Sequence, residues 1–277
     1  MSHIVITRDE AIGTITIERP ARFNSLDVET ARDLRCAALQ LARDTDIRVV
    51  ILRGTGGVFC SGADLKYIRA GGAQEDLAYL TPEARAVPAG YGEVFKQILE
   101  YIHSTISEIR RAPKPFVAAV DGIAAAGGFG LAMSCDVVLA SARSTFEWAY
   151  SKTGLTGAES STFLLPRLIG LRRSLELVLL NPRLYSWRAR DLGLVTRVFP
   201  DAAFEECVMD IARQLAAGPT KAFGIAKTLM NQAAGIDRLD YHLDQELEQL
   251  SRIASEPDFA AGLDAFFQKK EPTFSGR

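Results

Sequence analysis

A run of small residues near the middle of the chain has the composition of a turn that can polarise a carbonyl group. The run reads AAAGG over residues 124–128, after a strand-like segment at 116–120 and before a helical apolar pattern. Two adjacent glycines at a helix start, Gly127 and Gly128, leave backbone N–H groups unshielded at the positive end of the helix dipole. Such donors suit negative charge that develops on a carbonyl oxygen. Close packing of a helix on a strand is the alternative role for these glycines.

A second turn of small residues can supply the other donor that an oxyanion hole needs. It reads SGADLK over residues 61–66, after a buried strand predicted over 48–53 and a glycine-rich turn. A tight turn with a small residue at its apex can present a backbone N–H to a ligand. The alternative is that both turns only connect and pack their neighbours.

Together the two turns resemble those of the enoyl-CoA hydratase/isomerase (crotonase) superfamily. The resemblance continues through PARFNSL at 20–26, LPRLIG at 165–170 and ARDLGLV at 189–195, and it ends in FFQKK at 266–270. It therefore spans nearly the whole chain. It implies an α/β fold, a crotonase-like spiral of ββα units with a helical C-terminal region, and assembly as homotrimers or as dimers of trimers (hexamers).

The same resemblance implies a reaction class. The N–H groups of Ala63 and Gly127 would hold the carbonyl oxygen of an acyl-CoA thioester while it becomes an enolate. The enzyme would be a lyase or an isomerase of fatty acid metabolism. It would need no metal, and no cofactor beyond the coenzyme A moiety of its substrate.

Coenzyme A is large and carries phosphates, so its site calls for positive side chains and an apolar slot. The resemblance assigns contacts with this ligand to two cations, Arg22 and Lys66. The adenine side of the second turn is assigned to Ser61, Asp64 and Leu65. In the family the C-terminal helix reaches the ligand of a neighbouring subunit, and the matching residues here are Phe266 and Lys269.

The chain departs from its family at the proton-transfer groups. Hydratases place one glutamate three residues beyond the oxyanion glycine, where this chain has Gly130, and a second where it has Tyr150. Other branches, which include double-bond isomerases and aryl-CoA dehalogenases, place an acid where this chain has Ala158. The pair of carboxylates that holds and splits a water in hydratases is therefore missing.

Glu159 is the candidate for a surviving carboxylate, because it directly follows Ala158. A shift of one residue at a helix N-terminus rotates a side chain by about 100°, although a local change in the loop can bring it back. The alternative is a first-turn residue favoured by the helix dipole. One base can move a proton between two carbons, so isomerisation asks less of the site than hydration does. Hydration, however, is the commonest activity of the family.

His103 is the second candidate for proton transfer, on a predicted helix with apolar neighbours. The dehalogenase branch has a general-base histidine at this position, and a histidine with a pKa of about 6.5 exchanges protons near neutral pH. This favours an acyl-CoA hydrolase or aryl-CoA dehalogenase, but that branch also needs an aspartate where this chain has Ala158. A packed histidine is the alternative, and a catalytically weak acyl-CoA-binding protein is the third hypothesis for the whole chain.

The acyl pocket is expected to form around Trp148, Tyr150 and Ala158. Phe146, Trp148 and Tyr150 alternate as the side chains of a strand do. Because aromatic side chains bury large areas, a role as core residues is the alternative for them.

Composition argues against several other classes. The 277 residues are 48% hydrophobic, which allows a large core, and a net charge of −2 gives no general attraction to nucleic acid or to anionic membranes. No apolar run approaches the roughly 20 residues of a transmembrane helix, and no signal peptide is expected. The four cysteines and three histidines are scattered. We therefore expect no metal site and a cytoplasmic protein whose cysteines are reduced core thiols.

The pattern along the chain predicts a core at 1–200 that carries the acyl-CoA site and a helical region at 201–277 for packing and oligomerisation. Segment 71–91 is rich in Gly, Ala, Pro and charge, and it is expected to be mobile beside the site. Asp27 is expected to cap a helix. The predicted strands are 4–7, 12–18, 48–53, 116–120, 136–140 and 195–199, and the predicted helices before the C-terminal region are 28–44, 158–168, 173–181 and 186–192.

Overall fold

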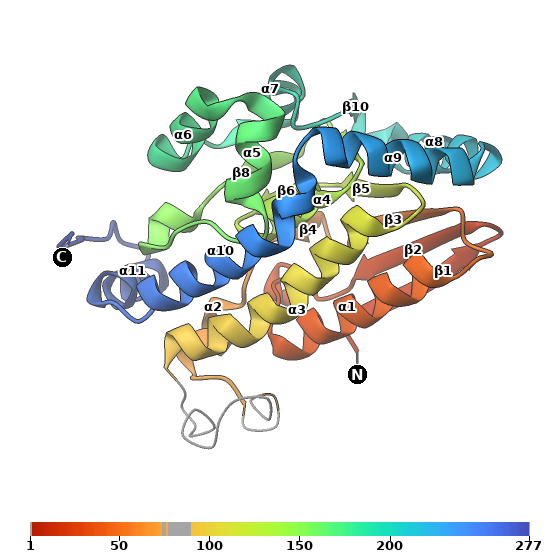
Figure 1. Cartoon of the computed structure of the whole chain (residues 1–277). Coiled ribbons are helices and arrows are strands. Elements are labelled where there is room, and N and C mark those ends of the chain that lie inside the picture. Colours follow the sequence, from red (N-terminus) through yellow and green to blue (C-terminus); the bar gives the residue numbers. More distant parts are fainter. Residues whose placement is uncertain (1, 74–75, 77–89, 277) are drawn as a thin grey trace.

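Two β-sheets with surrounding helices make up the computed structural model, which describes residues 2–73, 76 and 90–276 (Figure 1). The strands are β1 (Ile4–Asp9), β2 (Ile12–Ile17), β3 (Val49–Gly54), β4 (Val58–Cys60), β5 (Phe116–Val120), β6 (Ile123–Ala125), β7 (Val137–Ser141), β8 (Thr145–Glu147), β9 (Leu184–Tyr185) and β10 (Arg197–Phe199). The helices are α1 (Val28–Arg43), α2 (Leu65–Arg69), α3 (Tyr91–Arg111), α4 (Gly127–Ser134), α5 (Ser161–Ile169), α6 (Leu171–Leu180), α7 (Ser186–Leu192), α8 (Phe204–Ala217), α9 (Thr220–Ala233), α10 (Leu239–Ile253) and α11 (Pro257–Gln268). A short 3-10 helix, η2 (Tyr150–Thr153), follows β8.

The two sheets are built from consecutive pairs of strands. The larger sheet has the order β1-β2-β3-β5-β7-β10, and the smaller has the order β4-β6-β8-β9. In each of the pairs β3/β4, β5/β6 and β7/β8 the first strand joins the larger sheet and the second joins the smaller one. Strands β4, β6 and β8 run parallel, so their carboxyl ends lie at one edge of the small sheet. This arrangement confirms the predicted spiral of ββα units.

Helices cover both faces of the larger sheet. On one face, Phe204, Val208 and Ala212 of α8 pack on β3, β5 and β7. On the other face α3 lies between α1 and α10 (Figure 1). Asp27 caps α1 as predicted, because its side chain accepts a hydrogen bond from the Thr30 N–H at 2.9 Å.

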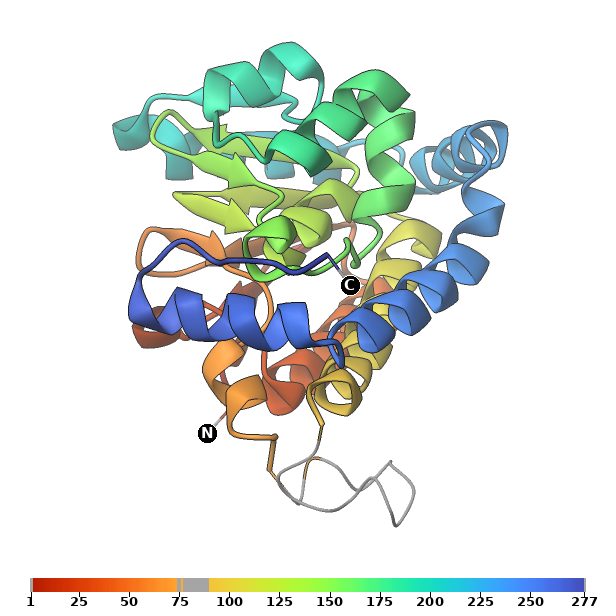
Figure 2. The ribbon, with the colours of Figure 1, turned by 90° about the vertical axis from the view of Figure 1, so that its left-hand side faces the viewer.

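The helices that follow residue 200 pack on the core. Helix α10 runs along α3, and α11 lies beside η2 (Figures 1 and 2). Among the described residues, no helix is long and apolar enough to cross a membrane. The division of the chain at residue 200 stays a prediction. Residues 74–75 and 77–89, which make up most of the segment expected to be mobile, lie outside the described residues.

Some local predictions are wrong for identifiable reasons. Strand β8 ends at Glu147, and Ala149 takes a left-handed conformation with φ 62°, so Trp148 and Tyr150 do not alternate along one strand. The helix expected from residue 158 begins at Ser161, because the two residues before it are left-handed. Cys60 and Cys135 are buried as expected, but Cys36 is exposed on α1.

Candidate active site

The two predicted oxyanion turns meet at the edge of the small sheet. Ala63 follows β4 and Gly127 follows β6, and these strands are paired neighbours. The turns touch closely: a Cβ on Gly62, whose φ is +88°, would lie 2.8 Å from the Gly127 nitrogen. Within the described part of the chain, neither the Ala63 N–H nor the Gly127 N–H donates to a protein acceptor. Both donors are therefore free to bind a ligand oxygen.

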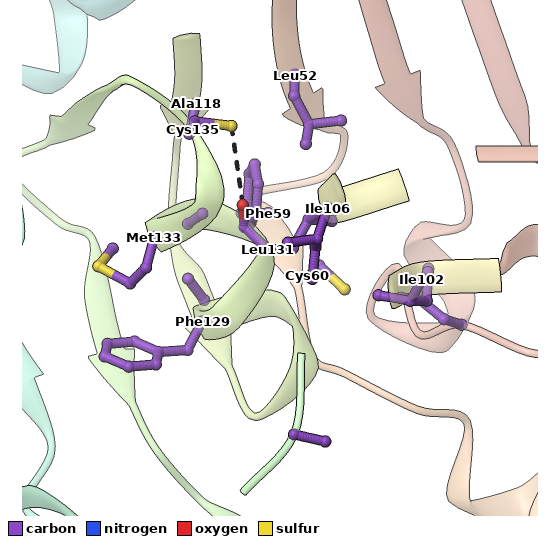
Figure 3. Packing of buried hydrophobic residues seen from close by; sticks show 14 of the residues in the cluster. Leu52, Phe59, Cys60, Ile102, Ile106, Ala118, Phe129, Leu131, Met133 and Cys135 are labelled. Atoms are coloured by element: carbon purple, nitrogen blue, oxygen red, sulfur yellow. Dashed lines mark hydrogen bonds between the residues drawn. The ribbon is translucent and has the colours of Figure 1, made fainter. Parts of the chain in front are cut away.

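The two adjacent glycines serve different purposes. A Cβ on Gly128 would lie 2.8 Å from the Cβ of Cys60 and would also meet the Cys60 carbonyl, so this position needs glycine for packing. The core around it is dense, with Phe129 and Leu131 of α4 in the same hydrophobic cluster as Cys60 (Figure 3). Gly127 instead lines a cavity. Ala126 before it has φ 47° and ψ −121°, a strained conformation of the kind that clusters at functional sites.

A cavity of about 400 Å³ opens beside these turns. Ten of the residues singled out in the sequence line it: Arg22, Ser61, Ala63, Asp64, Leu65, Lys66, Gly127, Tyr150, Glu159 and Phe266. Apolar side chains such as Phe95, Leu155 and Phe267 line it as well. The cavity thus combines free backbone donors, cations at its rim and an apolar wall.

Glu159 brings a carboxylate to the free backbone donors. Its side chain is buried, and a Cβ on Gly127 would lie 2.7 Å from Glu159 Oε1. The hydroxyl of Tyr150 donates a hydrogen bond to the other oxygen, Oε2. Burial raises the pKa of Glu159 to about 8, although the Tyr150 hydrogen bond lowers it and the nearby charge of Glu246 raises it. The carboxyl group can therefore hold or release a proton near neutral pH.

The other two carboxylates that line the cavity are bound to cations. Asp64 caps α2 and pairs with Arg19 at 2.7 Å and with Arg22, and these partners hold its pKa below its ordinary value against the effect of burial. Glu147 pairs with Lys152 at 2.5 Å. Among the described residues Glu159 has no Lys or Arg partner. It is therefore the carboxylate in this cavity that is free for acid–base work.

Comparison with known proteins identifies the family. The sequence matches the enoyl-CoA hydratase/isomerase family over residues 7–86 and 92–277. The 4-chlorobenzoyl coenzyme A dehalogenase-2 of Arthrobacter sp is 32% identical over 269 residues, 97% of this chain and 91% of that protein. The 1,2-epoxyphenylacetyl-CoA isomerase of Escherichia coli K12 is 30% identical over 278 residues, 100% of this chain and 98% of that protein.

Solved structures agree with these matches. The crystal structure of an enoyl-CoA hydratase from Mycobacterium avium subsp. paratuberculosis K-10 has a TM-score of 0.85 at 31% identity, and the match covers 99% of both chains. The chain belongs to the enoyl-CoA hydratase/isomerase family. The prediction of an enzyme of this family that acts on acyl-CoA thioesters is thereby confirmed.

Within the family, the missing acid at Gly130 has a structural reason. A Cβ on residue 130 would lie 2.9 Å from the Cβ of Glu159 and would also collide with the Glu159 carbonyl oxygen. Glu159 and Ser160 both have left-handed backbones, with φ 51° and 63°. This turn, which costs about 1–3 kcal/mol for each such residue, lays the Glu159 main chain over Gly130. A glutamate at 130 and the Glu159 turn as it stands exclude one another.

His103 lies behind the cavity rather than in its wall. It is buried on α3, and its Nε2 accepts a hydrogen bond from the Glu159 N–H at 3.3 Å. Burial lowers its pKa to about 3, so the ring is neutral at physiological pH. An acceptor nitrogen that is occupied by a backbone N–H cannot activate a water at the same time. The geometry therefore goes against His103 as the general base.

Three other predicted positions also differ from expectation. Trp148 does not line the cavity but packs against Tyr150, with 4.9 Å between ring centroids and the rings tilted by 56°. Ala158 is buried behind the wall, where its carbonyl oxygen lies 3.3 Å from the Tyr150 hydroxyl oxygen. Lys269 is exposed at the end of α11 and lies outside the cavity lining, whereas Phe266 lines the cavity of its own chain.

Glu246, a buried carboxylate on α10 next to the Glu159 turn, was not among the residues predicted from the sequence. It accepts hydrogen bonds from the N–H groups of Ser160 at 2.8 Å and Thr162 at 3.0 Å. The signal was available, since Leu239, Leu243, Glu246 and Leu250 recur on the buried face of one amphipathic helix. An acid on the apolar face of a helix marks a buried polar contact.

Proposed function

We propose that this enzyme moves a double bond within an enoyl-CoA thioester, with Glu159 as the group that carries the proton. The observation on which this rests is the position of Glu159 Oε1 beside Gly127, as the cavity carboxylate without a cation partner. One ionisable group at the reacting carbons is sufficient for proton transfer from one carbon to another. Hydration in this family uses two carboxylates, and this chain has Tyr150 at the position of the second one.

The proposed step is balanced within the substrate. Ionised Glu159 takes a proton from the α-carbon of a 3-enoyl-CoA, and the electron pair of that C–H bond moves into the thioester to form a dienolate. The N–H groups of Ala63 and Gly127 stabilise the charge on its oxygen. Protonated Glu159 then delivers a proton to the γ-carbon, and a 2-enoyl-CoA results. The Tyr150 hydroxyl, whose pKa burial raises well above its ordinary value, stays protonated and orients the carboxylate.

The coenzyme A part of the substrate would lie along the turn at 61–66. Lys66 is exposed at the rim of the cavity and free of carboxylate partners among the described residues, which suits a phosphate. Arg22 lines the same cavity, but it is paired with Asp64 and supports the turn as much as the ligand. Beyond the coenzyme A moiety, we propose no cofactor and no metal.

A panel of thioesters tests this proposal. We expect turnover of a 3-enoyl-CoA to the 2-enoyl product, little hydration of crotonyl-CoA, and loss of isomerisation by about 10³-fold or more in Glu159→Gln. Glu248→Gln, on the exposed side of α10, is the matched control. Unchanged isomerisation in Glu159→Gln would contradict the proposal. Turnover of 4-chlorobenzoyl-CoA that is lost in His103→Gln would favour a hydrolase or dehalogenase, and saturable binding without any turnover would favour a binding protein.

We propose an oligomer, a homotrimer or a dimer of trimers, in the cytoplasm, with a place in fatty acid metabolism. Large apolar side chains are exposed on α6 and α9, where a neighbouring subunit would cover them: Leu171, Leu175, Leu179, Leu180, Ile225, Leu229 and Met230. Light scattering after size exclusion tests the assembly, for which a monomer would be the contradicting result.

A further inference from the structure

The turn that presents Glu159 is held from two other helices. Glu246 on α10 accepts the N–H groups of Ser160 and Thr162, and also the Thr162 hydroxyl. His103 on α3 accepts the N–H of Glu159 at 3.3 Å. These acceptors satisfy N–H groups at the start of α5, where no intrahelical partner exists. The left-handed residues of the turn thus keep their conformation through contacts that come from distant parts of the chain.

The Glu246 carboxylate binds the 159–162 turn and no cationic side chain of Lys or Arg among the described residues. Its side chain is 3% exposed. The groups that face it are His103 from α3, with Nε2 at 3.9 Å, and His242 on its own helix, with Nε2 at 3.8 Å. Glu159, in the segment that precedes α5, is the nearby acid. A carboxylate at the N-terminus of a helix is favoured by the helix dipole, which accounts for its place here.

We propose that Glu246 is a positioning residue, which holds the 159–162 turn so that the Glu159 carboxylate stays beside Gly127. This inference rests on the proposed role of Glu159 and adds the contribution of α10 to the site. Helix α10 belongs to the region that was predicted to serve packing and oligomerisation. Because the backbone of Glu159 is fixed by its neighbours, loss of Glu246 would let the carboxylate move away from the reacting carbons. The oxyanion turns, which follow β4 and β6, would be unaffected.

Two substitutions separate positioning from general stability. Glu246→Ala removes both acceptors, while Glu246→Gln keeps one amide oxygen and removes the charge. We expect Glu246→Ala to lower kcat for 3-enoyl-CoA isomerisation by about 10²-fold while KM stays within roughly twofold, since small displacements of a reacting group are costly. Glu246→Gln should lose less. The acidic limb of the pH–rate profile of Glu246→Gln should move to lower pH, because removal of the nearby negative charge lowers the pKa of Glu159.

Controls make the outcome decisive. Glu248→Ala, on the exposed side of α10, should keep both kinetic constants. Binding of butyryl-CoA, which has no double bond to move, should be equal in all variants if the oxyanion turns are intact. A folded Glu246→Ala that binds butyryl-CoA and keeps its kcat would overturn the inference, while loss of activity in Glu159→Gln would leave the proposed function standing. Should Glu246→Ala not fold, an unshifted acidic limb and an unchanged kcat in Glu246→Gln would overturn it instead.

Discussion

The main chain of Glu159 lies over Gly130, so that a Cβ on residue 130 would come within 2.9 Å of the Glu159 Cβ. This one contact joins two features that looked separate in the sequence, a missing hydratase acid and a displaced carboxylate. The space that a side chain at 130 would need is filled by the residue that brings its own carboxylate to Gly127. The turn that excludes an acid at residue 130 therefore supplies the Glu159 carboxylate to the same site.

Any side chain at residue 130 should disturb catalysis. We expect Gly130→Ala to lower kcat by about 10²-fold, because the Glu159 turn must shift to make room. Gly130→Glu should not create a hydratase, since it collides with the same turn. Gly90→Ala is the matched control, because a Cβ there meets nothing within 4 Å. Crotonyl-CoA hydration gained by Gly130→Glu with its fold intact would show that the two acids can coexist.

The rate should rise with pH on its acidic limb. Glu159 must be ionised to take a proton, and its pKa is raised to about 8 by burial, so kcat/KM for the free enzyme should increase up to that region. Tyr150→Phe removes a hydrogen bond that lowers this pKa, so the limb should move to higher pH. Stopped-flow or steady-state profiles of both proteins measure this. A limb that moves to lower pH in Tyr150→Phe would contradict the assigned hydrogen bond.

The same pKa predicts how stability depends on pH. The folded pKa of Glu159, about 8, lies above its ordinary value of 4.5, so the folded protein binds more protons than the unfolded chain between these values. The contribution of Glu159 to stability is therefore complete below about pH 4.5 and is lost as the pH rises to about 8, on the order of 5 kcal/mol at most.

Glu159→Gln, which cannot ionise, should escape this loss. Its free energy of unfolding in urea should exceed that of the parent protein near pH 8 and approach it near pH 5, where the parent carboxyl is mostly protonated. Glu248→Gln, which alters an exposed side chain, is the control. Equal differences at both pH values would show that the buried carboxyl does not titrate in this range.

Lys66 should act on binding rather than on chemistry. Lys66→Ala removes an exposed cation from the rim of the cavity, so KM for an acyl-CoA should rise by roughly tenfold while kcat stays close to its original value. The KM should also become less sensitive to salt. Lys270→Ala, an exposed lysine beyond α11, is the control. A fall in kcat at constant KM would assign Lys66 to the reaction instead.

Sequence reasoning succeeded where local patterns decide the structure. The Asp27 cap, the strands at 49–54 and 116–120 and the two small-residue turns are set by nearby residues, and each is found close to its predicted place. The strands β4 and β6 were not predicted as such, because three residues are too few for an alternating pattern to emerge. The pairing of their carboxyl ends nevertheless follows from the ββα spiral.

The position of Glu159 could not be predicted in the same way. Helical geometry alone turns it away from the site, whereas the left-handed backbones of Glu159 and Ser160 turn it toward Gly127. That conformation is held by His103 and Glu246, which are far away in sequence. The role of His103 depends on the same turn. Its place in the sequence resembles that of a general-base histidine in the dehalogenase branch, but its ring accepts the N–H of Glu159.

The most direct test of the account is proton exchange at the substrate carbons. In D₂O the enzyme should introduce deuterium at the α- and γ-carbons of an enoyl-CoA, as followed by NMR, because Glu159 exchanges its proton with solvent between removal and return. Glu159→Gln should bind the same thioester and lose this exchange by about 10³-fold or more. Deuterium incorporation at the original rate in Glu159→Gln would contradict the central claim that this carboxylate carries the proton.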